Sequence, residues 1–148
     1  MTRLAPGLHL TAPEGWEVRL RRQTETHGRQ NVVVHAATVP LVPGRGDFGS
    51  GVVTTLGVDD LFVCLLEYDL AAAATALFAV QGIPRPAPIE FSPNAMQRTL
   101  PGQSGGQWFF TVAGRPWCLH VVLGSHARRV PGAVRVNALL DGLTIGAT

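Results

Sequence analysis

The glycine pattern at residues 44–49 (GRGDFG) matches the consensus that binds dinucleotides in βαβ proteins. That chemistry needs a strand that ends before the first glycine and a helix that begins at the third, so that helix N-terminal amides face the pyrophosphate. Prolines precede the pattern and a Ser-Gly pair follows it, so we expect neither element there. We therefore predict that residues 43–51 form a loop that contacts another protein through Arg45, Asp47 and Phe48.

A second candidate site consists of Arg128 and Arg129, which directly precede a predicted C-terminal helix. Two guanidinium groups and the amides of a helix first turn together suit a phosphate or a carboxylate. The pair is therefore a candidate anion-binding site. The alternative is that both arginines are solvated loop charges.

The cysteines and histidines are candidate metal ligands. Cys118 and His120 share one face of a predicted strand, and Cys64 or His35 on a neighbouring strand could join them in a zinc site. No Cys-x-x-Cys or paired-histidine spacing supports such a site, and the apolar surroundings are typical of buried structural residues. We predict no metal and no cofactor.

Residues for acid–base or nucleophilic catalysis are present only as fragments. The adjacent pair Ser125-His126 does not by itself bring a nucleophile and a base together. Glu67 and Asp69 form a carboxylate pair at the end of a predicted strand, where we expect solvent access. General acid–base catalysis needs a desolvated partner in a cleft. We therefore predict no catalytic residue.

The composition indicates a folded chain with few charges. Of its 148 residues, 46% are apolar and 15% are charged, whereas an average protein has roughly 25% charged residues. Such a chain is not disordered, and its length predicts a single domain over residues 1–148. All 12 basic residues are arginines, the net charge is +2, and the densest group is Arg19, Arg21 and Arg22. A nucleic-acid-binding protein usually has a stronger basic stripe, so we expect no nucleic-acid partner.

Targeting signals and cysteine usage indicate a compartment. The apolar runs are too short to span a bilayer, and the first residues do not resemble a secretory signal. Cys64 and Cys118 lie in apolar runs, which is typical of buried thiols in a reducing compartment. We expect a cytoplasmic protein without membrane insertion.

Apolar patterning predicts five main strands, and residues 96–100 are a candidate for a further strand that pairs with residues 108–112. A period of two over residues 16–21, followed by the β-branched run 32–36, indicates a hairpin. Residues 61–66 are apolar on both faces and predict a central strand. Residues 107–112 and 117–123 predict a second hairpin with its tight turn at Gly114-Arg115.

Two helices are expected. The alanine run at residues 71–80 predicts a helix that Asp69 caps. Residues 130–143 have apolar side chains at spacings of three and four, which predicts an amphipathic helix with Pro131 in its first turn. Antiparallel hairpins with grouped helices indicate an α+β fold, an antiparallel sheet packed with helices.

The opening segment, residues 8–16 (LHLTAPEGW), resembles the start of the PsbP/Mog1-like fold, and the order of elements is similar over most of the chain. Residues 45–51 and 97–103 also resemble stretches of small actinobacterial proteins of that type. The resemblance implies a sandwich in which a hairpin opens an antiparallel sheet and a long C-terminal helix packs on it. It also implies a binding or assembly role.

Together these observations predict a non-catalytic protein-interaction or assembly module. Low charge with high apolar content also suggests self-association. The alternative is a small-molecule-binding domain or weak enzyme, whose pocket between sheet and helix would be lined by Trp108, Trp117 and Tyr68.

Overall fold

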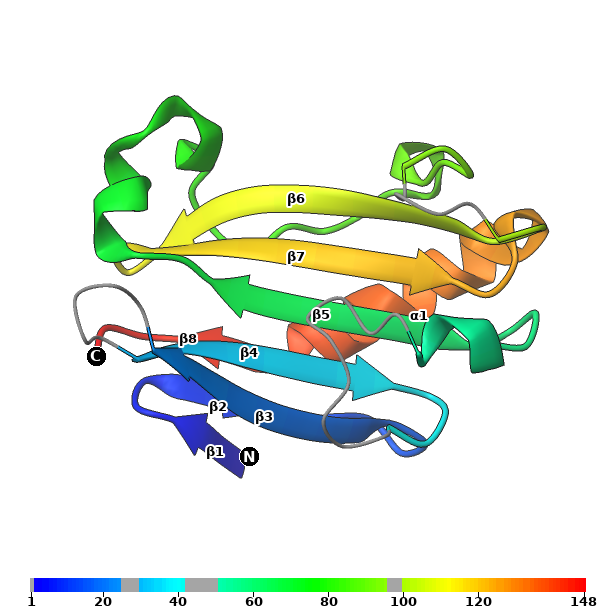
Figure 1. Cartoon of the computed structure of the whole chain (residues 1–148), viewed down its shortest axis with the longest axis horizontal. Coiled ribbons are helices and arrows are strands. Elements are labelled where there is room, and N and C mark those ends of the chain that lie inside the picture. Colours follow the sequence, from blue (N-terminus) through cyan, green and yellow to red (C-terminus); the bar gives the residue numbers. More distant parts are fainter. Residues whose placement is uncertain (1, 25–29, 42–50, 96–99) are drawn as a thin grey trace.

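The computed structural model describes residues 2–24, 30–41, 51–95 and 100–148. Its larger sheet has five antiparallel strands in the order β3-β4-β5-β7-β6 (Figure 1). These strands are β3 (Glu17–Thr24), β4 (Gln30–Ala37), β5 (Leu61–Glu67), β6 (Ser104–Val112) and β7 (Arg115–Leu123). As its two-sided apolar pattern predicts, β5 is the middle strand, and all of its side chains except Leu66 are buried.

A smaller antiparallel sheet and the single α-helix of the described residues lie on one face of the large sheet (Figure 1). The small sheet has the order β1-β2-β8. Its strands are β1 (Thr2–Ala5), β2 (Leu8–Leu10) and β8 (Leu143–Ile145), and the helix is α1 (Arg129–Asp141). The predicted α+β class, the opening hairpin and the C-terminal helix are therefore confirmed.

The main core fills the space between the large sheet and these elements. Leu65 and Leu119 from the sheet, Leu10 from β2 and Val136 and Leu140 from α1 belong to one buried apolar cluster. The opposite face of the sheet carries a smaller cluster that includes Val33, Phe62, Cys64 and Val122. No helix among the described residues is both long enough and apolar enough to cross a membrane.

The helix predicted over residues 71–80 is absent. Two short 3₁₀ turns, η2 (Leu70–Ala74) and η3 (Ala76–Phe78), occupy the segment, and the Asp69 side chain caps neither. Alanine favours helix locally, but most helical stability in proteins comes from packing an amphipathic face. Phe78 is the only buried side chain of the two turns, so this segment has no such face.

The turn between β6 and β7 lies one residue earlier than predicted. Ala113 and Gly114 are its central residues, with φ of 52° and 75°. Positive φ at both positions is the type I′ geometry, whose twist matches that of the flanking strands. Arg115 belongs to β7 and is buried.

The other described turns are η1 (Val53–Thr55), η4 (Pro88–Glu90) and η5 (His126–Arg128).

Candidate functional site

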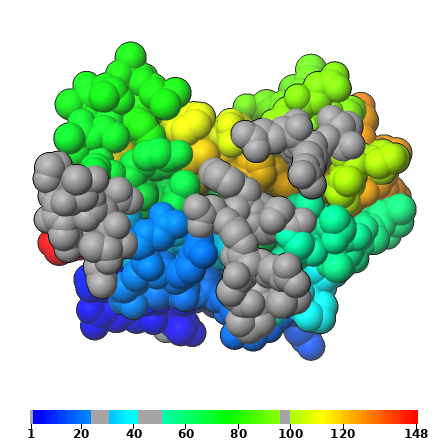
Figure 2. All heavy atoms as spheres, in the orientation of Figure 1, coloured from blue at the N-terminus to red at the C-terminus, as the bar shows by residue number. Residues whose placement is uncertain are grey.

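The strongest candidate for a functional surface is the segment of residues 70–80, here called the apolar lobe. Leu70, Leu77 and Val80 are 48%, 58% and 62% exposed, and four of its alanines are also exposed. No charged residue occurs from residue 70 to residue 84. Exposed apolar residues scattered singly are ordinary, whereas a contiguous patch marks an interaction site. The apolar lobe projects from one end of the sheet (Figures 1 and 2).

One buried aromatic side chain fixes this lobe to the sheet. The Phe78 ring lies 5.1 Å from the Tyr68 ring and 5.5 Å from the Phe109 ring. The Thr111 hydroxyl donates to the Phe78 carbonyl at 2.7 Å, and the Thr111 amide donates to the Val80 carbonyl at 2.8 Å. The exposed side chains are therefore presented on a backbone with a defined shape.

The predicted site residues are placed as follows. Arg45, Asp47 and Phe48 lie outside the described residues. Arg128 forms an exposed ion pair with Asp59, Nε to Oδ1 at 2.9 Å. Arg129 donates instead to the carbonyl of His126 at 3.0 Å. In this arrangement the two guanidinium groups make separate protein contacts.

The three aromatic residues expected around a pocket do not surround one space. Trp117 is completely buried in the main core, and Trp108 packs beside it against Phe91. Tyr68 packs instead on Phe78 and Phe109, next to the apolar lobe. Between the large sheet and α1 lies an apolar cavity of about 20 Å³ lined by leucine, valine and alanine side chains.

His35, Cys64 and His120 are neighbours in the register of β4, β5 and β7. Within the described part of the chain, no three histidine, cysteine or acidic side chains are grouped so that they could hold a metal ion. Both cysteines are buried, and they are not joined in a disulfide. Burial raises the pKa of the Cys118 thiol to about 12, so it stays protonated and unreactive at neutral pH.

Residues 102–106 (GQSGG) match the Gly-x-Ser-x-Gly pattern of hydrolase nucleophiles, a match that sequence reasoning missed. The chemistry needs the serine exposed on a sharp turn between a strand and a helix. Ser104 instead begins β6, opposite Leu123, and its side chain is fully buried. Its position in a strand therefore gives no support to a nucleophilic role.

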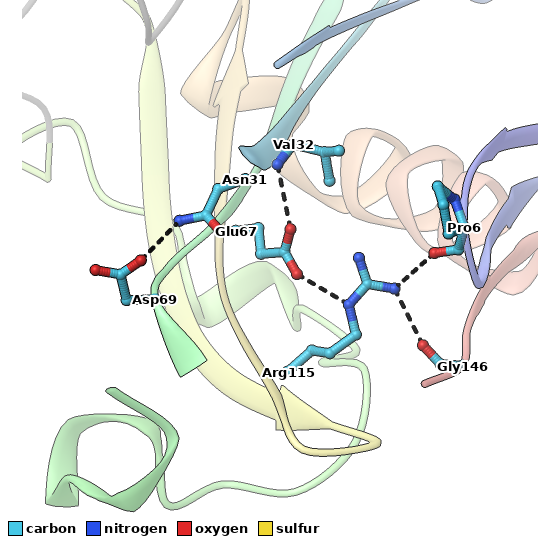
Figure 3. Close-up of polar contacts among 7 residues, drawn as sticks. All are labelled: Pro6, Asn31, Val32, Glu67, Asp69, Arg115 and Gly146. Carbon is cyan, nitrogen blue, oxygen red and sulfur yellow. Dashed lines mark hydrogen bonds and ion pairs between the residues drawn. The ribbon is translucent and has the colours of Figure 1, made fainter. Parts of the chain in front are cut away.

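Glu67 is buried and paired, contrary to the solvent access expected for it. Arg115 Nε donates to Glu67 Oε2 at 2.9 Å, and these side chains are 3% and 1% exposed. Arg115 Nη1 also donates to the carbonyls of Pro6 and Gly146, while Glu67 Oε1 accepts from the Val32 amide (Figure 3). The guanidinium thus joins the small sheet to the large one. Because the guanidinium contacts protein groups in both sheets, we assign Arg115 a structural role.

The pH dependence of stability should contain a contribution from His120. Burial lowers the pKa of His120 from its ordinary value of 6.5. As the pH falls below about 6.5, the unfolded chain therefore binds a proton that the folded chain does not, and the stability falls. We expect urea denaturation to show this loss between pH 7 and the lowered pKa, with a slope of at most about 1.4 kcal/mol per pH unit.

His120→Gln removes the titrating group, so the loss over that interval should be smaller in this variant. An identical pH dependence of stability in both proteins would contradict the assignment.

No protein-family model matches this chain, and no significant match to a curated protein or to a solved structure is found either.

Proposed function

We propose that this protein is a non-catalytic protein-interaction module and that the apolar lobe is its principal contact surface. The observation that carries the proposal is the exposure of Leu70, Leu77 and Val80 within a stretch that has no charge. Removing apolar surface from contact with water lowers the free energy, so a partner protein that covers such a surface is bound more tightly. The interior of protein interfaces is likewise depleted of charged residues.

The fixed shape of the lobe supports the same function. Association costs free energy when side chains and loops must be ordered at the interface. Here the Phe78 anchor and the Thr111 hydrogen bonds hold the segment before any partner arrives. A surface that is already ordered loses less entropy on binding.

The proposal also includes the expected loop contact, self-association, fold relationship and cellular location. Arg45, Asp47 and Phe48 would supply a second contact, and self-association through the lobe is one form that the interaction can take. A PsbP/Mog1-like relationship is supported by the hairpin of β3 and β4 that opens the large sheet and by α1 near the C-terminus. A cytoplasmic location is supported by the two buried cysteines, which are not joined in a disulfide.

A small-molecule-binding domain or weak enzyme has less support. Ligand pockets usually measure about 300–1,000 Å³, and the cavity between the large sheet and α1 measures about 20 Å³. An open groove of about 290 Å³ next to Trp16 and Thr38 is the better place for such a ligand. Its lining has no cluster of converging charged groups among the described residues.

The double variant Leu77→Ser/Val80→Ser should weaken binding of the partner about ten-fold or more, because truncating two interface anchors costs more than about 1.4 kcal/mol. The measurement is recovery of partner proteins with the tagged full-length chain from cells that produce it naturally. Val58→Ser is the matched control, since Val58 is 64% exposed and Val80 is 62% exposed.

Equal recovery with the double variant and with the Val58→Ser control would contradict the proposal. Loss of the partner with Phe48→Ala, while the double variant retains it, would move the surface to residues 43–51.

A further inference from the structure

The outer edge of β6 offers unpaired backbone groups. In an antiparallel ladder, alternate residues direct their N–H and C=O groups away from the neighbouring strand. The backbone of Thr111 is directed outward in this way and bonds to Val80 and Gly82. The backbone of Gly105 is also directed outward and bonds to Ser92. By the same alternation, the backbone N–H and C=O groups of Gln107 and Phe109 are directed away from β7. Among the described residues, neither has a backbone partner on that side.

Among the described residues, the chain that borders β6 forms backbone bonds to its two ends and none to this stretch. It forms a bridge at Gln81 with Thr111, leaves the edge, and returns to form a second bridge at Ser92 with Gly105. In between it runs against α1, where Asn137 Nδ2 donates to the carbonyl of Pro86 at 3.0 Å. In Figure 2 the yellow atoms of this strand lie in the notch between the green lobe and the lime segment that follows it.

The chemistry of this edge differs from that of the opposite edge of the sheet. Proteins commonly protect edge strands with charged side chains. The other edge strand, β3 (EVRLRRQT), carries four charged residues, whereas β6 (SGGQWFFTV) carries none. The apolar lobe that ends the open stretch is also uncharged. The Glu90 carboxylate does contact this strand, where it accepts a hydrogen bond from Trp108 Nε1 at 3.0 Å. Because burying an unpaired charge is costly and β6 itself carries none, this edge suits an uncharged segment.

We propose that the open stretch of β6 binds an extended, uncharged peptide segment of a partner protein, which adds to the sheet as a further strand beside the apolar lobe. This inference rests on the proposed function and specifies how the partner is held. Strand addition obtains its affinity from main-chain hydrogen bonds and its specificity from alternate side chains. Five residues of β6 lie between the bridged residues Gly105 and Thr111, which are about 20 Å apart along the strand.

A single extended segment fits this notch better than a second copy of the chain. The apolar lobe and the segment that follows it stand beyond β6 at its two ends (Figure 1). The β6 edge of a second copy carries the same two projections. An edge-to-edge dimer would have to fit all four projections while its two edge strands came to about 5 Å from each other, whereas a single extended segment has none.

Amide hydrogen exchange of the free full-length protein tests the edge itself. Trp108 and Phe110 donate within the ladder, so their amides should be protected, while those of Gln107 and Phe109 should exchange about a hundred-fold faster or more. Slow exchange at all four amides would overturn the proposal, because the edge would already be covered.

Binding is tested with peptides selected on the full-length protein from a phage-displayed random library. A selected peptide should protect the amides of Gln107 and Phe109. N-methylation of its backbone should weaken binding about ten-fold at alternate positions and little at the positions between them, because only alternate amides face β6. Effects without this alternation would overturn the proposal, and so would a library that yields no peptide protecting the two amides.

Gln107→Pro provides the complementary change in the protein. The outward N–H is not part of the β6–β7 ladder, so proline at this edge position should leave the melting temperature near that of the wild type and abolish peptide binding. Trp108→Pro is the control that removes a ladder bond. If Gln107→Pro binds the peptide normally while Leu77→Ser/Val80→Ser loses the partner, strand addition is wrong and the proposed function stands.

Discussion

Arg115→Ala should lower the free energy of unfolding by about 3–5 kcal/mol, because it leaves the Glu67 carboxylate buried without its cation. The Glu67 side chain is 1% exposed, so its carboxylate is shielded from bulk water in the folded protein. The variant also loses the hydrogen bonds to the carbonyls of Pro6 and Gly146, which connect the small sheet to the large one. Equilibrium urea denaturation measures the change.

Arg128→Ala is the matched control, since the ion pair with Asp59 is exposed and such pairs contribute at most about 1 kcal/mol. The double variant Arg115→Met/Glu67→Leu should recover part of the lost stability, because it removes both charges together. A stability of Arg115→Ala within about 1 kcal/mol of the wild type would contradict the structural role assigned to this pair.

Trp117→Ala should destabilise the fold by a similar amount, about 3–5 kcal/mol, because it removes the largest fully buried side chain and leaves a cavity. The variant also loses the contact between the Arg115 guanidinium and the indole ring, whose centroid lies 5.0 Å from Arg115 Cζ. A loss of stability this large is expected for a residue of the core and not for a side chain that lines a ligand pocket.

Trp108→Ala provides the comparison, since the Trp108 side chain is only partly buried. This variant should lose less than half as much stability as Trp117→Ala. Denaturation curves of the two variants give the ratio directly. An equal loss in both, or a Trp117→Ala protein of unchanged stability, would place Trp117 outside the core.

Patterns that repeat along the chain predicted the sheet well. The alternation over residues 16–21 gave β3, and the two-sided apolar run gave β5 as the middle strand. These predictions are correct because burial of one or both faces of a strand produces an apolar pattern in neighbouring residues. The alanine run failed as a helix because propensity alone does not supply a buried face.

The buried polar contacts were harder to predict because they join distant parts of the chain. Arg115 lies 48 residues from Glu67 and 109 residues from Pro6, and no local pattern encodes either contact. The apolar lobe did carry a signal, since residues 70–84 contain no charge. The alanine run within it predicts a helix, and a helix without a polar face would itself leave apolar surface to be covered.

Site-specific photo-crosslinking in the native cell tests the interaction surface most directly. p-Benzoylphenylalanine in place of Leu77, which is 58% exposed, should give a covalent adduct with one partner protein. The same group in place of Val58, which is 64% exposed elsewhere on the molecule, should give no such adduct. Absence of an adduct at Leu77, or the same set of adducts at both positions, would contradict the assignment of the apolar lobe as the surface that binds another protein.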